Sequence, residues 1–322
     1  MSNRKYIGVD LGAWYNKDNK TSIAVGVEVI SGNEKKLRIL KIVKEYTKGY
    51  TKKTNDNREY VCNSIEVKKL LNDNGKKILN KDNWNLYLTW QEKNKYLIDY
   101  IIDEAANNAL ISIDAPFSTP ALLKNVQEEY YELKECYKDK ETEKEEALMH
   151  RLQLQNPYLF DNSARFIYEH TCLQVLAPSA TLIGALSSRM AHIIDLDRNK
   201  AKNLNSKMLN ICVSPKLDER ECGVNTIEVY PAATLAVLSL KYSKYKDDNW
   251  NKEEATMLTQ IEKYVDITEK VKGQIKTDDD YDAIICALTA YLVDKKDGYL
   301  KPDNKEDLDK FTNSFIYIPK ID

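Results

Sequence analysis

The chain has 322 residues, with 48 Lys and Arg against 50 Asp and Glu and a formal net charge of −2. A chain of this length can bury a substantial core, as one elaborated domain or as two ordinary ones. The balanced charge excludes global electrostatic steering toward nucleic acid, although a local basic face remains compatible with it.

Hydropathy and targeting patterns favour a soluble cytoplasmic protein. The mean hydropathy is −0.56, and no run of 18 uncharged apolar residues is present to span a bilayer. The N-terminus, MSNRKYIGVDLG, lacks the pattern of a signal peptide because an acidic strand follows its short basic start.

The six cysteines include no CxxC pair and are expected to be mostly buried thiols. None of the three histidines adjoins a Cys or Ser nucleophile, so no His-dependent triad is expected.

The first part of the chain predicts three strands. Residues 5–12 form an apolar run that ends at a carboxylate and a glycine, and residues 21–30 and 37–46 are rich in β-branched side chains. Their short connections indicate an antiparallel meander. Residues 47–60 are polar and basic and are predicted to form a loop.

Helices dominate the remainder of the predicted order. Apolar residues fall on one helical face at 96–108, and a further strand is predicted at 109–114. A long stretch with helical spacing follows, and then come a strand at 224–230 and helices beginning at 231, near 253–265 and at 279–293.

This order predicts a mixed α/β fold with a five-stranded sheet. The first three strands would be antiparallel, and βα crossovers would add the last two. Residues 121–220 would be a large helical insertion between the fourth and fifth strands. We expect residues 1–322 to form a single domain, because internal repeats and low-complexity linkers are absent.

Two aspartates end strands that are expected to be parallel neighbours. Asp10 ends the first strand and Asp114 ends the fourth. Ligands of open α/β sheets bind beyond the carboxyl ends of parallel strands. Two carboxylates this close repel each other, so either raised pKa values or a bound cation must compensate. With oxygen ligands alone, the expected ion is Mg²⁺ or Mn²⁺.

Further acids occur on other predicted elements. Asp279 and Asp282 lie three residues apart at the start of the helix at 279–293, on one helical face. Helix capping is the alternative role for the acids of this turn. Glu228 lies within the strand at 224–230, where it either faces solvent or joins a polar site.

Four segments together resemble a known family. They are Gly8-Val9-Asp10, then 113–117 (IDAPF), then 228–235 (EVYPAATL, the most specific), then 279–283 (DDYDA). In this combination the chain resembles the family called domain of unknown function 429, from residue 5 to about 293. Members of that family are regarded as predicted nucleases of the ribonuclease H-like superfamily.

The resemblance implies a ribonuclease H-like fold and a set of site residues. Metal-binding acids would be Asp10, Asp114 and Asp282, with Asp279 as the alternative on the last helix. Glu228 belongs to the family's own motif and would join Asp10, Asp114 and Asp282 in the catalytic set. Residues 163–169 resemble the family's arginine-plus-acid segment, but the acid follows Arg165 by four residues, which differs from the family spacing.

The implied chemistry is hydrolysis of nucleic-acid phosphodiester bonds with two Mg²⁺ or Mn²⁺ ions. Arg165 would bind a phosphate oxygen, or else pair with Glu169 one turn away. Nine basic residues between 35 and 58 would form a basic edge for the phosphate backbone, among them Lys48, Lys52 and Lys53. Lysine-rich edge strands also deter aggregation, which is the alternative explanation.

Two competing functions remain in view. An actin-like ATPase would need a second Asp-Gly phosphate loop, and the chain has only 10 glycines and a late Asp297-Gly298 outside any strand pattern. A catalytically inactive ribonuclease H-like protein would serve in binding or as a scaffold, and a phosphohydrolase would act on another phosphate substrate. The sequence leaves open the oligomeric state and the choice of DNA or RNA.

Overall fold

The computed structural model describes a large part of the chain. The residues described are 4–12, 21–44, 51–53, 59–61, 94, 97–106, 108–117, 162–173, 186, 189–196, 209–212, 215, 217, 224–246, 249–295, 298–304, 308 and 315–321. Among these residues, no helix is long and apolar enough to cross a bilayer.

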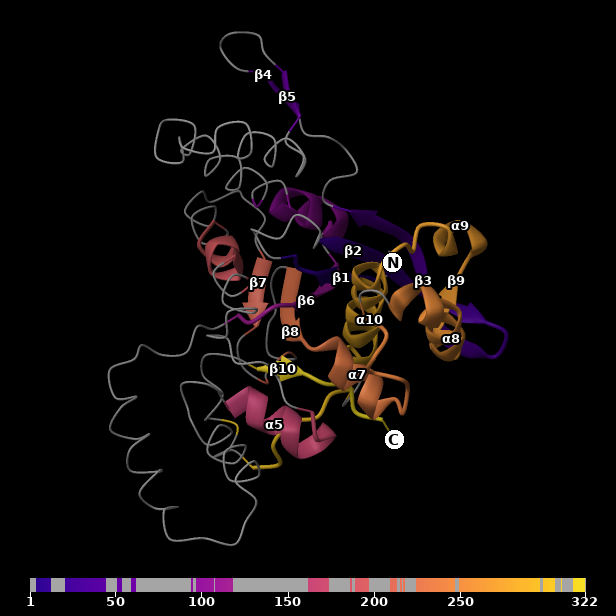
Figure 1. The fold of residues 1–322 in the computed structure, drawn as a ribbon. Coiled ribbons are helices and arrows are strands. Elements are labelled where there is room, and N and C mark those ends of the chain that lie inside the picture. The colour runs from indigo at the N-terminus through magenta and orange to yellow at the C-terminus, as the bar shows by residue number, and fades with distance from the viewer. Residues whose placement is uncertain are drawn as a thin grey trace, which may run out of the picture.

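A mixed sheet of mostly parallel strands forms the centre of the molecule (Figure 1). β1 pairs antiparallel with β2, and β2 pairs antiparallel with β3, whereas the other pairings in this sheet are parallel. In spatial order the strands are β10 (Ile316–Tyr317), β8 (Val224–Val229), β6 (Ala109–Asp114), β1 (Lys5–Asp10), β2 (Ser22–Ser31), β3 (Glu34–Lys44) and β9 (Val265–Ile267), and β7 (Leu209–Cys212) also pairs with β8.

The predicted α/β class is confirmed, but the predicted strand count is wrong. The five predicted strands form the contiguous centre β3-β2-β1-β6-β8 of an eight-stranded sheet. β9 and β10 are only three and two residues long, which is too short for a periodicity to be visible. β7 lies inside the predicted helical insertion at 121–220, so that insertion is not wholly helical. Residues 121–161 of it lie outside the described part, and the single-domain prediction stays a prediction.

Two local predictions also need correction. The turn between β2 and β3 is tighter than expected, because Ser31 pairs with Glu34 around Gly32, whose φ of 64° suits glycine. β3 therefore begins three residues earlier than predicted. The predicted loop at 47–60 contains β4 (Thr51–Lys53), which pairs with β5 (Glu59–Val61) as a separate two-stranded sheet.

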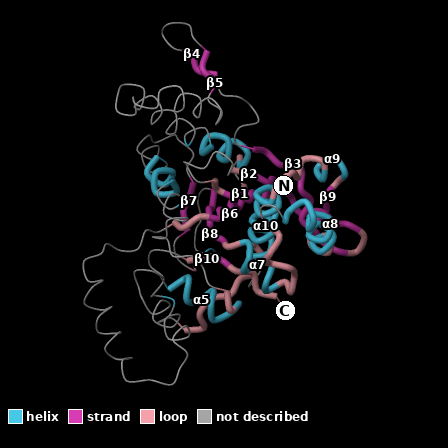
Figure 2. The backbone as a smooth tube through the Cα atoms, viewed as in Figure 1, coloured by secondary structure: helices cyan, strands magenta, loops and turns pink. Residues whose placement is uncertain are grey.

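The helices flank the sheet (Figure 2). Residues 97–105 are helical, in agreement with the helix predicted at 96–108. The strand predicted at 109–114 is β6. The helix expected near 253–265 begins and ends earlier. The named helices are α5 (Asn162–Thr171), α7 (Pro231–Val237), α8 (Trp250–Ile261), α9 (Glu269–Lys272) and α10 (Asp278–Val293).

Two buried clusters occupy the two faces of the sheet. One contains Tyr6, Leu110 and Ile227 together with side chains from α7, α8, α9 and α10, and Figure 1 shows these four helices grouped beside the sheet. The other contains Ile7 and Ile111 together with side chains from the helical residues 97–105. Successive strand residues point to opposite faces, so these two sets assign each strand position to a face.

α10 packs directly on the backbone of β1. A Cβ atom added to Gly8 would lie 2.1 Å from the carbonyl oxygen of Ala283 and 2.2 Å from the amide nitrogen of Ala287. The Ser112 hydroxyl of β6 donates a hydrogen bond of 2.6 Å to the carbonyl oxygen of Cys286. This close approach fixes the N-terminal turn of α10 beside the carboxyl ends of β1 and β6.

Replacing Gly8 by Ala should therefore destabilise the fold strongly. We expect a loss of about 3 kcal/mol or more in the free energy of unfolding, because backbone atoms cannot yield to the new methyl group. Urea-induced unfolding measures the change. Gly273→Ala is the matched control, since its added Cβ would lie 3.6 Å from the carbonyl oxygen of Lys270, an ordinary van der Waals contact. Equal effects of the two substitutions would contradict the packing described.

Candidate functional site

Asp10 and Asp114 stand side by side at the end of adjacent parallel strands. They are direct register partners in the β1–β6 pair, and neighbouring strands lie about 4.8 Å apart. In-register residues of parallel strands point to the same face, and Gly8 and Ser112, two residues earlier in each strand, contact α10. Both carboxylates therefore lie on the α10 face, as the sequence predicted from the strand ends.

The first turn of α10 brings three acids to the same place, with distinct roles. Asp280 is completely buried and forms a capping box with Thr277. It accepts hydrogen bonds from the amides of Lys276 and Thr277 at 2.7 and 3.1 Å and from the Ser22 hydroxyl at 2.7 Å. The Lys44 ammonium lies 2.8 Å from its Oδ2 atom. Asp280 is thus a structural cap, which is the role that the sequence left open for this turn.

Asp282 is also buried, with 1% of its surface exposed. Its Oδ1 atom accepts a 2.6 Å hydrogen bond from the Tyr245 hydroxyl, and its Oδ2 atom lies 2.7 Å from the Lys246 ammonium. Both partners come from the connection between α7 and α8. Asp279 lies one turn earlier on the same helix and is partly buried.

The carboxylates interact electrostatically as one group. Burial raises the pKa of Asp10 well above its ordinary value, and the charges of Asp282, Asp279 and Asp114 add to the increase. Burial raises the pKa of Asp114 to about 7, against the lowering effect of Lys246. The pKa of Asp279 rises to about 6 through burial and its acidic neighbours. These shifts show that negative charge is crowded at this point.

Lys246 supplies positive charge among these acids. The carboxylate of Asp282, followed by those of Asp114 and Asp10, raises the pKa of Lys246 despite its partial desolvation. Within the described residues, no three His, Cys, Asp or Glu side chains stand close enough together to hold one metal ion as they are arranged here. The Lys246 ammonium, 2.7 Å from Asp282, thus compensates part of the negative charge of the acids.

Sequence reasoning missed Lys246 and Tyr245. They lie in a polar stretch between two helices, where no periodicity predicts which side chains turn inward. Tyr245 is 1% exposed and packs edge-on against Tyr281, with ring centroids 5.6 Å apart. The sequence feature that would have pointed to this anchor is a tyrosine between two lysines, at 244–246, in an otherwise polar stretch.

Glu228 lies on the other face of the sheet. It is the register partner of Ile113, whereas Asp10 and Asp114 are partners of each other, one residue further along. Its Oε2 atom accepts a 3.0 Å hydrogen bond from the amide of Phe117, in the turn that follows Asp114. Glu228 therefore holds the backbone beyond Asp114, on the opposite face from the other three acids.

The predicted nucleic-acid contacts fall largely outside the described side chains. Arg165 lies in α5, but only its backbone is described, and the same holds for Lys52 and Lys53 in β4. Lys48 lies outside the described residues. These substrate contacts stay predictions.

The described part of the predicted basic edge is largely neutralised. β9 pairs with β3 at Leu37–Ile39, so the expectation of a free edge strand is wrong there. Each of the five described basic side chains of β3 has an acidic or carbonyl partner: Lys35 with Glu28, Lys36 with the carbonyl of Glu262, Arg38 with Asp266, Lys41 with Glu104, and Lys44 with Asp280.

A buried arginine fixes the chain just beyond Asp10. Arg189 is 1% exposed, and its guanidinium donates hydrogen bonds to the carbonyl oxygen of Gly12, to the Thr21 hydroxyl and to the Asn94 side chain. The carboxyl end of β1 is therefore held from the face opposite α10.

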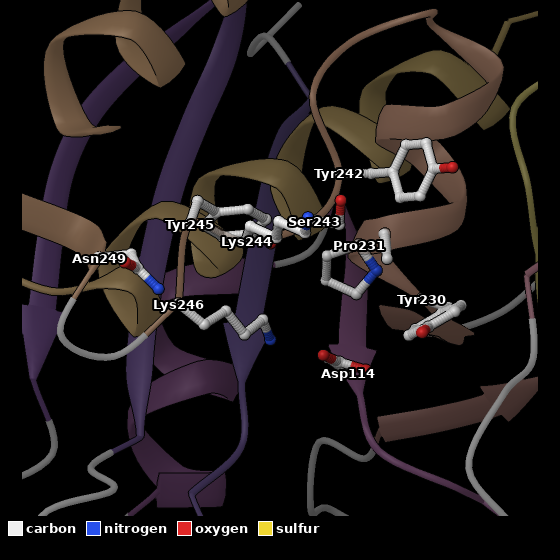
Figure 3. A pocket seen from close by; sticks show the side chains of 10 residues that line it. Asp114, Tyr230, Pro231, Tyr242, Ser243, Lys244, Tyr245, Lys246 and Asn249 are labelled. Carbon is white, nitrogen blue, oxygen red and sulfur yellow. The ribbon is translucent and has the colours of Figure 1, made fainter. Parts of the chain in front are cut away.

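A pocket of about 370 Å³ opens next to the acids. Figure 3 shows Lys246 entering from one side, with its ammonium pointing toward Asp114, and Tyr230 and Tyr242 on the other side. Its remaining lining residues come from the start of α7 and from the α7–α8 connection: Pro231, Ala232, Ser243, Lys244, Tyr245 and Asn249.

Comparison with known proteins identifies one family. The family model described as "Protein of unknown function (DUF429)" matches residues 96–307, which contain Asp114, Glu228, Asp282 and the pocket. No curated protein and no solved structure matches the chain.

The two kinds of buried aspartate should respond oppositely to neutralisation. Asp10→Asn removes one charge from a repelling group, so its melting temperature should equal or exceed that of the wild type. Asp280→Asn breaks charged hydrogen bonds and a buried ion pair and should lower stability by about 3 kcal/mol. Differential scanning calorimetry of both variants checks this contrast. A clear loss of stability in Asp10→Asn would show that Asp10 has a structural role instead.

Proposed function

The chain belongs to the DUF429 family of proteins of unknown function, and from that premise we propose that it is a Mg²⁺- or Mn²⁺-dependent nuclease that hydrolyses phosphodiester bonds of nucleic acid. The observation that carries the proposal is the meeting of Asp10, Asp114 and Asp282 on one face at the ends of β1 and β6. The central strand order β3-β2-β1-β6-β8, with an antiparallel first half, supports a ribonuclease H-like assignment for the fold.

The chemistry of the donor groups fits a hard divalent cation. All three acids offer carboxylate oxygens, which Mg²⁺ and Mn²⁺ prefer. Burial and neighbouring carboxylates raise the pKa values of Asp10 and Asp114, and a bound cation would relieve this crowding of negative charge. Asp10, Asp114 and Asp282 would hold the metal, with Asp279 as a further ligand. When bound, the metal would activate a water molecule and stabilise the leaving oxygen.

The other residues of the site would position substrate. Lys246 lies 2.7 Å from Asp282 and is 55% exposed, so its side chain can turn from the carboxylate toward a phosphate oxygen when a cation takes its place. Glu228 would keep the turn after Asp114 in place through the Phe117 amide. Arg165, Lys48, Lys52 and Lys53 would contact the nucleic-acid backbone.

One observation favours a second candidate, a catalytically inactive binding protein. Lys246 already neutralises Asp282, and no ready-made three-residue metal cluster is found in the described part of the chain. If this pairing is permanent, the acids and the ammonium form an ionic network whose role is structural. The two candidates differ in whether Mn²⁺ displaces the lysine.

Cleavage by charge-neutral variants tests the nuclease proposal. Wild-type protein with Mn²⁺ should cleave labelled single- or double-stranded oligonucleotides. Asp10→Asn and Asp114→Asn should each reduce the rate at least about 100-fold while the protein stays folded, because each removes a metal ligand. Lys272→Gln, which changes a surface ion pair outside the site and outside the predicted basic edge, is the control. Undiminished cleavage by both aspartate variants would exclude this site as the source of activity.

Metal affinity separates the two candidates. If Lys246 competes with a divalent cation for Asp282, Lys246→Met should bind Mn²⁺ severalfold more tightly than the wild type in isothermal titration calorimetry. Lys272→Met, at an exposed lysine that also pairs with carboxylates, should leave the affinity unchanged. Absence of Mn²⁺ binding in both wild type and Lys246→Met would favour the inactive binding protein.

A further inference from the structure

We propose that the pocket beside Asp114 binds one unpaired nucleotide, with its base against the tyrosine rings and its phosphate at Lys244 and Lys246, so that the substrate is a single strand or a frayed end. This inference rests on the proposed function, because it names the substrate class of the same site. It begins from the position of the pocket: Asp114 is both a site acid and a lining residue.

The lining has the two chemistries that a nucleotide needs. Tyr230 and Tyr242 offer ring surface, and 42% of Tyr242 is exposed. Lys244 and Lys246 offer positive charge, and Ser243 and Asn249 offer polar groups for a base edge or sugar. Aromatic faces with neighbouring cations are the common means of binding unpaired bases.

The α7–α8 connection is built to hold these side chains in place. Tyr245 is inserted into the core and donates its hydroxyl to Asp282, so its two neighbours Lys244 and Lys246 are placed beside the pocket. Ser239 and Lys244 adopt left-handed backbone conformations, with φ of 57° and 60°. Such conformations are uncommon in non-glycine residues and persist where surrounding structure enforces them.

The shape of the pocket favours an unpaired base. At about 370 Å³ it offers room for one nucleotide. In a duplex, both faces of a base are stacked and its edge is paired, so the base cannot lie against a protein ring unless it leaves the stack.

Fluorescence anisotropy in EDTA measures binding without turnover. The probes are a labelled ten-nucleotide single strand, as DNA and as RNA, and the same sequence closed into a blunt hairpin duplex. Tyr242→Ala should weaken single-strand binding about tenfold or more, whereas Tyr242→Phe, which keeps the ring, should stay close to wild type. Leu40→Ala, which truncates a side chain of similar exposure on β3, should have no effect. Lys244→Gln should reduce the dependence of affinity on salt by about one phosphate contact.

The outcomes separate this inference from the nuclease proposal. Single-strand binding that Tyr242→Ala leaves intact, or equally tight binding of the duplex, overturns the nucleotide pocket even if Mn²⁺-dependent cleavage occurs. Absence of single-strand binding by wild type also overturns it. Tyr242-dependent binding without cleavage in Mn²⁺ supports the pocket and instead refutes hydrolysis.

Discussion

Crowding of carboxylates at the end of two parallel strands is the constraint on which the rest of the site depends. Asp10 and Asp114 are forced together by strand register, and α10 adds Asp282 because its backbone lies against Gly8. The protein stabilises this arrangement with Lys246 and with the Tyr245 hydroxyl. An acid cluster that must be compensated in this way is costly for folding alone, which is why a functional role for it is the simplest explanation.

The sheet separates the residues proposed to take part in chemistry from those that support them. On the α10 face are the carboxylates and the pocket, whereas Glu228 and Arg189 act from the opposite face on the turns that follow β6 and β1. Each of these two buried side chains hydrogen-bonds a backbone atom within three residues of Asp114 or Asp10. The strand ends are therefore fixed from behind, and the carboxylates have little freedom to relieve their repulsion by moving apart.

Much of this arrangement could be predicted from the sequence, because strand period and register are local properties. The apolar runs ending at Asp10 and Asp114 predicted that the two carboxylates lie close together at one edge of the sheet, as their register confirms. The face of the sheet on which Glu228 lies could be assigned only from the register of β8 against β6. No single sequence segment contains that register. Asp280 and Asp282 could not be told apart, since their roles depend on Ser22, Lys44 and Lys246 from distant elements. β9 and β10 were not predicted, because such short strands form through pairing with distant strands and leave no periodic pattern in the sequence.

α10 and the α7–α8 connection, which meet where Tyr245 is inserted into the core, differ in how freely their residues can be substituted. α10 serves both the core and the acids, so almost any change along its buried side disturbs folding and chemistry together. In the α7–α8 connection, by contrast, Leu238 and Tyr245 are buried, whereas residues 242–244 and 246 are exposed. These exposed side chains can be exchanged without repacking the interior. If the pocket binds a ligand as proposed, its selectivity can therefore change through these exposed residues while the acidic centre stays the same.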